Sequence, residues 1–93
     1  MTEKELVQGT VVQHFKREML SPEERANSRK YLYEIIGVAE HTESGERLVI
    51  YRALYGEGRL FARPVEMFLS ETDREKYPEA TQRFRFERAA DEN

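Results

Sequence analysis

The sequence of 93 residues contains no cysteine and no tryptophan. Without cysteine, the chain can form neither a disulfide nor a thiolate metal site. Without tryptophan, the five phenylalanines and five tyrosines must supply most of the large side chains of the core. A chain of this length forms one domain, and its core is modest because a small domain buries a smaller fraction of its surface than a large one.

The sequence also lacks any apolar run that approaches the ~18 residues of a membrane span. Its first residues, MTEKELVQG, are acidic and lack the apolar segment of a signal peptide. We therefore expect a cytoplasmic protein with no membrane partner. Residues 1–8 are expected to be flexible or weakly helical, and the fold is expected to start at Gly9.

An excess of positive charge is missing as well, because 15 Lys and Arg stand against 18 Asp and Glu, and the net charge is −3. Non-specific nucleic-acid binding depends on neutralising phosphates with Lys and Arg. We therefore do not expect a nucleic-acid partner, although the composition leaves room for a local basic patch.

The strongest strand signal lies at Leu48–Tyr55, which is rich in β-branched and aromatic residues and is bounded by glycines. Because side chains alternate along a strand, Tyr51 and Tyr55 share one face, and Arg52 lies on the other among leucine and isoleucine. Neither face is polar throughout, which predicts a central strand covered on both sides.

A hairpin is predicted next, because residues 55–59 (YGEGR) contain two glycines that supply the positive φ of a tight connection. The following strand is Leu60–Pro64, and Pro64 ends it because proline cannot donate to the ladder. Residues 64–68 then predict a short helical turn that places Met67 or Phe68 in the core.

Three further strands are predicted at Thr10–Lys16, at Tyr31–Glu40 with a bulge at Gly37, and at Gln82–Arg88. Between the first two, residues 21–24 (SPEE) form a helix start with a serine cap, proline at the first position and glutamate at the third. No apolar stripe follows, so residues 17–30 are predicted to be a surface excursion with one or two helical turns.

These elements predict a mainly β fold, a small five-stranded SH3-like barrel with one or two short helical turns. The long connection after the first strand, the tight hairpins between the second, third and fourth strands, and the helical turn before the fifth are typical of that architecture. The single barrel domain spans residues 9–88, and residues 89–93 are expected to form a flexible tail.

Several strings are distinctive: residues 9–16 (GTVVQHFK), 37–46 (GVAEHTESGE) and 49–56 (VIYRALYG), then Arg63-Pro64 and Met67-Phe68. In this order they resemble the small bacterial family named domain of unknown function 1653, over about residues 9–88. The resemblance implies a compact β-rich domain of SH3-barrel type and implies no activity. The segment at residues 17–30 is longer than in a minimal member.

The two histidines, His14 and His41, lie near strand ends and would be neighbours if the first two strands pair. With Glu40, Glu43 or Glu46 they could form a metal site or an acid–base pair. The alternative is that each is a half-exposed histidine bonded to a loop carbonyl. Because no H-E-x-x-H spacing occurs, we predict no metal and no cofactor, and place both at the rim of a ligand site.

The aromatic and basic side chains each allow two interpretations. Tyr51 and Tyr55, with Tyr31 and Tyr33, could line a groove for a peptide or a cationic group, or could pack in the core. Arg52 and Arg63 could bind a carboxylate or phosphate. Their alternative is a structural ion pair, with partners among Glu34, Glu46 and Glu66.

A basic edge could bind RNA, or could be a solvated edge strand whose charges prevent aggregation. Its members would be Arg59, Arg83, Arg85 and Arg88. The second interpretation fits the acidic balance of the chain better.

No G-x-S-x-G motif and no glycine-rich phosphate loop occurs. We therefore predict a non-enzymatic binding module that recognises a peptide or protein segment on one barrel face. The alternatives are a small enzyme or metabolite-binding protein that uses His14, His41, Arg52 and Arg63, or a weak single-stranded RNA binder. The sequence does not indicate an oligomeric state.

Overall fold

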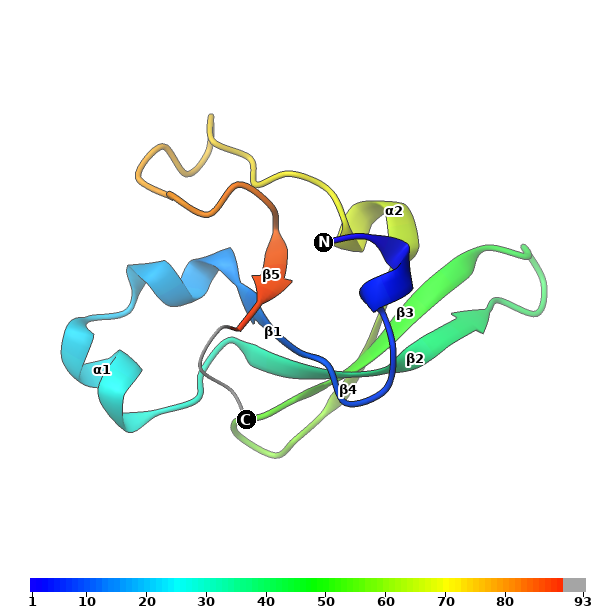
Figure 1. Ribbon diagram of the computed structural model, residues 1–93, viewed down its shortest axis with the longest axis horizontal. Helices are drawn as coiled ribbons and strands as arrows, with labels where there is room; N and C mark the ends of the chain where they lie inside the picture. The colour runs from blue at the N-terminus through cyan, green and yellow to red at the C-terminus, as the bar shows by residue number, and fades with distance from the viewer. Residues whose placement is uncertain (90–93) are drawn as a thin grey trace.

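The computed structural model describes residues 1–89 and contains a five-stranded antiparallel sheet with strand order β4-β3-β2-β1-β5 (Figure 1). The strands are β1 (Val11–His14), β2 (Leu32–Glu40), β3 (Arg47–Ala53), β4 (Leu60–Pro64) and β5 (Phe86–Arg88). Two short helices, α1 (Pro22–Asn27) and α2 (Val65–Phe68), and two 3-10 turns, η1 (Glu3–Glu5) and η2 (Phe15–Met19), complete the fold. Apart from Ala89, the predicted tail at residues 89–93 lies outside the described residues.

The predicted mainly β fold is confirmed, and each predicted strand has a counterpart in the sheet. Among the described residues the ladder does not close on itself, because β4 and β5 are its two edges. The sheet is therefore an open one as far as strand pairing is concerned. No helix in the described part of the chain is long and apolar enough to cross a membrane.

The β2–β3 hairpin confirms the predicted bulge. The register shifts between Ile35, which faces Tyr51, and Gly37, which faces Ile50. Ile36 is therefore the extra residue of the bulged strand, and such a residue bends the strand and increases its twist.

The surface excursion after β1 also follows its sequence signal. The Ser21 hydroxyl accepts a hydrogen bond from the backbone N–H of Glu24 at 3.1 Å, and the Glu24 carboxylate accepts one from the backbone N–H of Ser21 at 3.3 Å. Pro22 is the first helical residue, and no side chain of α1 is buried. This is a complete capping box on a helix that contributes nothing to the core.

Strand β3 is central in the sheet, and its two faces are covered to different degrees. Its inner face carries Val49 and Tyr51, which are 0% and 4% exposed. On the opposite face Leu48 and Ile50 are half-buried and Arg52 is exposed. The predicted coverage of both faces is therefore partial on the outer face and ends at Arg52, which lies in solvent.

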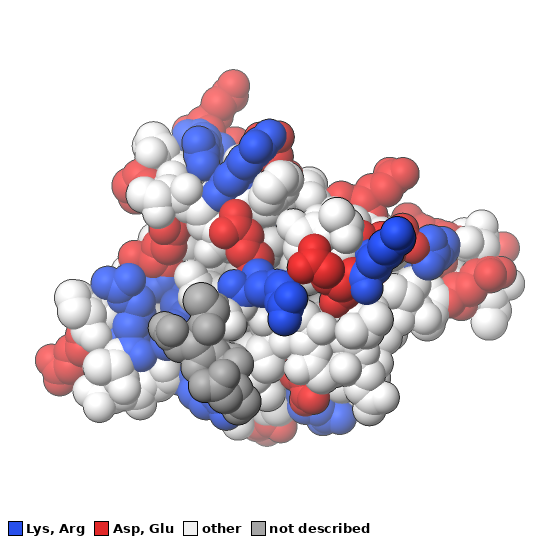
Figure 2. Space-filling model, viewed as in Figure 1, with Lys and Arg blue, Asp and Glu red and all other residues white. Residues whose placement is uncertain are grey.

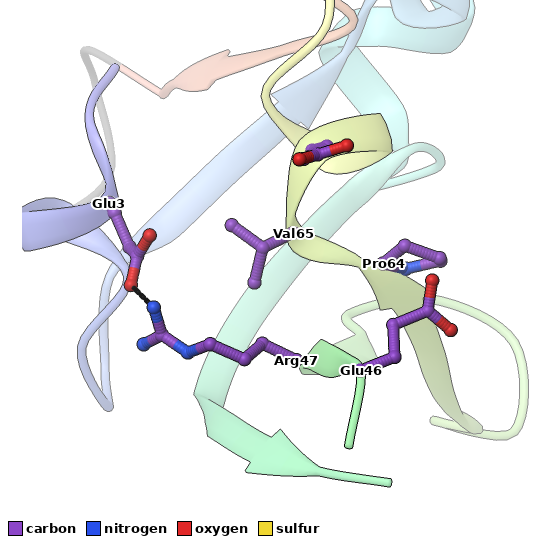
Figure 3. Close-up of a pocket in the computed structure, with 6 residues that line it drawn as sticks. Glu3, Glu46, Arg47, Pro64 and Val65 are labelled. Atoms are coloured by element: carbon purple, nitrogen blue, oxygen red, sulfur yellow. Dashed lines mark ion pairs between the residues drawn. The ribbon is translucent and has the colours of Figure 1, made fainter. Parts of the chain in front are cut away.

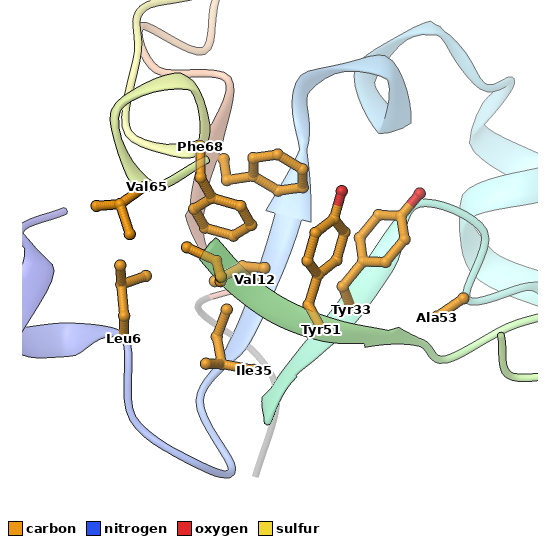
Figure 4. Close-up of a cluster of buried hydrophobic side chains, with 10 residues drawn as sticks. Leu6, Val12, Tyr33, Ile35, Tyr51, Ala53, Val65 and Phe68 are labelled. Atoms are coloured by element: carbon orange, nitrogen blue, oxygen red, sulfur yellow. The ribbon is translucent and has the colours of Figure 1, made fainter. Parts of the chain in front are cut away.

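The core gathers on the inner face of the sheet under α2 (Figure 4). The rings of Phe68 in α2 and Phe86 in β5 stack with 4.0 Å between centroids and 3° between planes. Tyr51 of β3 packs edge-on against Phe68 at 5.2 Å. The neighbouring Met67 is 50% exposed, so of the two residues predicted for this turn it is Phe68 that enters the core.

The first residues contribute to this core, although the sequence predicted that the fold starts at Gly9. Leu6 is 4% exposed and belongs to the same buried cluster as Val65 of α2 (Figure 4). Turn η1 precedes it, and the Glu5 carboxylate accepts a hydrogen bond from the backbone N–H of Thr2 at 2.7 Å. The segment at residues 1–8 therefore supplies an apolar side chain that alternation in the strands could not reveal.

The buried amide of Gln82 connects β1 to the chain that leads into β5. Its Nε2 lies 2.9 Å from the carbonyl oxygen of Gln13, 3.0 Å from that of Phe84 and 3.3 Å from that of Arg85. Its Oε1 accepts a hydrogen bond from Nε2 of Gln13 at 3.2 Å. Because Gln82 is 8% exposed, water cannot readily replace these partners.

We expect Gln82→Ala to lower the free energy of unfolding by about 1–3 kcal/mol, since it removes all the hydrogen bonds that the buried amide forms. Urea denaturation followed by circular dichroism measures this change. Gln8→Ala is the matched control, because Gln8 is exposed and its loss should change stability by less than about 0.5 kcal/mol. Equal urea midpoints for the two variants would contradict the role given to Gln82.

Candidate functional site

A hollow of about 330 Å³ lies where η2, the end of β4 and the chain between residues 73 and 85 meet, and we call it the basic pocket. Four cationic side chains line it: Lys16, Arg63, Lys76 and Arg85. The rest of its lining is His14, Asp73 and the rings of Phe15 and Tyr77.

Arg63 reaches the basic pocket from β4 and is held through one nitrogen. Its Nε donates a hydrogen bond to the hydroxyl of Tyr51 at 3.2 Å, and its guanidinium lies over the ring of Phe86 at 5.6 Å. The two terminal amino groups have no hydrogen-bond partner in the described part of the protein. Arg63 is thus oriented by the core and keeps its bidentate end free.

Arg85, which directly precedes β5, is held in the same way. Its Nε donates to the hydroxyl of Ser70 at 3.2 Å, and its backbone N–H donates to the Ser70 carbonyl at 2.9 Å. Its terminal amino groups are likewise without a partner among residues 1–89. Two arginines therefore present unoccupied donors to one pocket.

The two lysines lie close to one aromatic ring. Nζ of Lys16 lies 5.9 Å and Nζ of Lys76 lies 5.6 Å from the centroid of Tyr77. The ring of Phe15 packs edge-on against that of Tyr77, with 4.9 Å between the centroids. Cation–π attraction of this kind holds an ammonium near a ring without neutralising its charge.

None of the four cations of the basic pocket forms an ion pair with a carboxylate within the described residues. The pocket's own acid, Asp73, uses its Oδ1 to accept the backbone N–H groups of Glu75 at 3.1 Å and Lys76 at 3.2 Å. Elsewhere the basic side chains do find acids, as in the pairs Arg47–Glu3, Arg83–Glu71 and Arg88–Glu5. The basic pocket therefore has an uncompensated positive charge.

His14 is 8% exposed and forms the inner end of the basic pocket. Its Nδ1 accepts the backbone N–H of Lys16 at 3.1 Å, so the neutral ring bears its proton on Nε2. Burial and, after it, the charges of Arg63, Lys16 and Arg85 together lower the pKa of His14 to about 4. At neutral pH the ring is therefore an uncharged donor and a weak base.

The structure does not bring the two histidines together. Strands β1 and β2 do pair, but they are antiparallel, so His14 lies beside Tyr31 at the beginning of β2, and His41 follows its end. His41 is exposed, and its Nδ1 accepts the backbone N–H groups of Glu43 at 3.1 Å and Ser44 at 3.2 Å. Both histidines thus accept backbone N–H groups, where a bond to a loop carbonyl was the alternative considered.

The predicted arginine and tyrosine contacts separate in the structure. Arg63 lies in the basic pocket, whereas Arg52 lies on the outer face, 3.4 Å from the carbonyl oxygen of Gly58. Neither pairs with a carboxylate in the described chain, so the predicted structural ion pairs are absent there. Tyr51 is 4% exposed and belongs to the core, and it touches the site only by accepting the hydrogen bond from Arg63.

Tyr55 is half-buried and lies at a second hollow, the α1 hollow, which is open and has a volume of about 670 Å³. Its hydroxyl lies 2.7 Å from that of Tyr33, and burial together with this hydrogen bond raises the pKa of Tyr33. The α1 hollow lies between the surface excursion and Tyr55, which is one of the predicted contact residues.

Tyr31 connects the α1 hollow to the basic pocket. Its ring lies 6.0 Å from that of Tyr55 and 6.2 Å from that of His14. Its backbone has φ +70°, which is uncommon for a residue other than glycine and costs conformational energy. Tyr31, half-buried and with a strained backbone, thus lies between the basic pocket and the α1 hollow.

A third hollow of about 350 Å³ is acidic, in contrast to the basic pocket. Glu3, Glu46 and Glu66 line it with Arg47, Pro64 and Val65, and Arg47 forms an ion pair with Glu3 (Figure 3). No group of three or more metal-ligating side chains occurs in residues 1–89. The acidic charge of this hollow is therefore partly balanced by the Arg47–Glu3 ion pair, and the described residues form no metal-binding cluster there.

A broad basic surface for nucleic acid is not seen in Figure 2, where basic and acidic side chains alternate over the face shown. The four arginines considered for such an edge also separate. Arg83 and Arg88 pair with glutamates, Arg85 turns into the basic pocket, and Arg59 lies in the connection between β3 and β4.

Sequence reasoning identified two of the basic pocket's residues, His14 and Arg63, and did not assign Lys16, Lys76 and Arg85 to it. These three come from separate segments, and no spacing rule connects them. The one available signal was Tyr77, the only aromatic residue in the charged segment 70–83.

Comparison with known proteins identifies a family. The model of the family described as protein of unknown function (DUF1653) matches residues 10–88. No curated protein and no solved structure matches the chain.

Proposed function

Because this chain belongs to the DUF1653 family, whose description names no reaction, we propose from the basic pocket that it is a non-enzymatic binding module. Its ligand is a peptide or protein segment that places an anionic group among the four cations. The observation that supports this most is that two arginines and two lysines line one pocket without an ion pair in the described chain.

The aromatic rings between the basic pocket and the α1 hollow favour a chain-like ligand over a single small ion. From the basic pocket, such a segment would run past Tyr31, whose ring lies 6.2 Å from that of His14 and 6.0 Å from that of Tyr55, to the α1 hollow. Aromatic rings offer such a segment apolar contact at low entropic cost, because they have few rotatable bonds. The charge fixes the register of the segment, and the rings add contact area.

The state of His14 supports binding over catalysis. A general acid or base acts best when its pKa lies near the working pH. The pKa of His14, at about 4, makes it neutral and weakly basic at pH 7. It is suited to donate a hydrogen bond from Nε2 and poorly suited to exchange a proton.

We further infer an SH3-like arrangement of the sheet, which the strand order and the long connection after β1 support. The guanidinium of Arg63 in the β4 edge lies over the ring of Phe86 in the β5 edge at 5.6 Å, so the two edges approach each other. The cytoplasmic location and the bacterial origin stay predictions.

Selection from a display library of random peptides tests the proposed function. We expect the enriched peptides to share an acidic residue, and Arg63→Gln to weaken their binding at least about tenfold, because a charge-assisted hydrogen bond contributes ~1.5–3 kcal/mol. Arg52→Gln is the matched control, since Arg52 lies on the outer face of the adjacent strand and should leave affinity unchanged.

Two results would contradict the proposal. One is enrichment of peptides that have no acidic residue in common, and the other is wild-type affinity in the Arg63→Gln protein. Both variants are first compared with wild type by circular dichroism, so that a loss of binding is not a loss of fold.

A small anionic metabolite is the second candidate ligand, because ligand pockets begin at roughly 300 Å³ and the basic pocket is of that size. His14 and Arg63 then bind the metabolite, while His41 and Arg52 lie outside the site. Thermal unfolding in the presence of small carboxylates and phosphates distinguishes this candidate, since it predicts a raised Tm without any peptide.

A further inference from the structure

The basic pocket has a larger charge than one carboxylate can balance. Four cations and one carboxylate line it and His14 is neutral, so the net charge of the pocket is +3. We propose that the anionic group bound there is a phosphomonoester carried on a peptide side chain. This inference rests on the proposed function and specifies its ligand.

Charge balance is the first argument. A carboxylate brings one negative charge and leaves the pocket at +2, while a phosphomonoester brings nearly two at neutral pH. Like charges that face one another in a partly buried hollow repel, and a dianion removes more of this repulsion than a monoanion. The pocket therefore discriminates by charge as well as by hydrogen bonding.

The placement of the donors is the second argument. The cations come from four separate segments: η2, β4, the turn after Asp73, and the residue before β5. The arginines use Nε for Tyr51 and Ser70, which leaves their terminal amino groups for a ligand. A phosphate accepts hydrogen bonds at three oxygens around a tetrahedron, whereas a carboxylate accepts at two oxygens in one plane.

His14 adds a donor that does not depend on charge. Its Nδ1 is occupied by the backbone N–H of Lys16, so Nε2–H is the nitrogen left to meet a ligand oxygen. Within residues 1–89, Nε2 has no hydrogen-bond partner. It is not fully enclosed, so a ligand atom can reach it. A phosphate oxygen next to Nε2 is thus bound by a neutral donor and by cationic ones.

Asp73 is the one group in the pocket that would repel a phosphate. Its Oδ1 already accepts two backbone N–H groups, and these bonds hold the carboxylate against its own turn. The same turn brings Lys76 to the ring of Tyr77. Asp73 therefore positions a cation of the pocket while its own charge is partly satisfied.

Three peptides with neutral flanks and a single variable position test the inference: one with phosphoserine, one with glutamate and one with serine. Binding is measured by calorimetry in phosphate-free buffer, with shifts of backbone amide signals in NMR spectra to locate the site. We expect the phosphoserine peptide to bind at least about tenfold more tightly than the glutamate peptide, and the serine peptide not to bind.

Arg85→Gln should weaken binding of the phosphoserine peptide about tenfold or more, since it removes the unpaired terminal amino groups of one arginine. Arg83→Gln is the matched control, because Arg83 lies two residues earlier and pairs with Glu71 outside the pocket. Lowering the pH from 7.5 to 5.5 should weaken binding of the phosphoserine peptide but not of the glutamate peptide, because the second ionisation of the phosphate lies near pH 6. His14 stays neutral over this range, because its pKa is about 4.

The outcomes separate the two levels of the proposal. Equal affinity for the phosphoserine and glutamate peptides overturns the phosphomonoester and leaves the binding module intact. If no peptide binds and the display library enriches no acidic motif, both fail. If free O-phosphoserine, or a 5′-phosphorylated oligonucleotide, binds as tightly as the peptide, the phosphate is retained and the peptide as its carrier is overturned.

Discussion

Phe68→Ala is expected to lower the free energy of unfolding by about 3–5 kcal/mol, the range for removing a fully buried phenylalanine ring. Phe68 is 0% exposed, and its ring is stacked on Phe86 and flanked by Tyr51. Small domains have a total stability near the lower end of ~5–15 kcal/mol, so the variant should be largely or partly unfolded at room temperature. Urea and thermal denaturation followed by circular dichroism measure the loss.

Met67→Ala provides the comparison within the same short helix. Met67 precedes Phe68 in α2 and is 50% exposed, so its truncation should cost less than about 0.5 kcal/mol. If the two variants lost similar stability, the effect would belong to helix α2 as a whole, and the stacked pair would not be the centre of the core.

Acid should destabilise the protein through His14 by up to ~3 kcal/mol between pH 7 and pH 4. The folded state holds the pKa of this ring at about 4, below its ordinary value of 6.5. Above pH 6.5 the ring is neutral in both states and its contribution to stability is complete. As the pH falls from 6.5 toward 4, the unfolded chain takes up a proton that the folded chain does not, and stability is lost.

Urea denaturation at several pH values tests this, with His14→Asn and His41→Asn beside wild type. Asparagine retains an acceptor for the backbone N–H but does not titrate. The His14→Asn protein should lose less stability across the window than wild type, by the amount due to the ring. The His41→Asn protein should follow wild type, because His41 is exposed. Identical slopes for wild type and His14→Asn would contradict the burial of a neutral ring.

Local signals predicted most of the fold. The capping box at Ser21 and Glu24 is contained in four consecutive residues, and the bulge at Gly37 interrupts an alternating pattern. Leu6 could not be predicted in the same way, because it lies outside any alternating pattern and joins a buried cluster with Val65 of α2, which lies far along the chain. Alternation could not show how far the outer face of β3 is covered, and there Leu48 and Ile50 are half-buried while Arg52 is exposed.

The candidate site was less accessible from the sequence than the fold. Arg63 attracted attention because it precedes Pro64 at a strand end, and His14 because histidine is rare in this chain. Lys16 was assigned to a strand, and Arg85 to a solvated edge, because a strand was expected from Gln82 onward. The chain stays irregular until Phe86, since Gln82 binds the carbonyl groups of residues 84 and 85, and this irregularity turns Arg85 into the pocket.

The place of β5 beside β1 has a consequence for synthesis. On the ribosome, β1 emerges early and pairs with β2, and β3 and β4 can then add in order. The other edge of β1 stays unpaired until β5 emerges, and the ring of Phe68 has no stacking partner until Phe86 follows. A nascent chain therefore exposes an open strand edge and an aromatic ring together, the combination by which incomplete β domains associate with one another. A ribosomal pause before residue 86 would prolong that exposure.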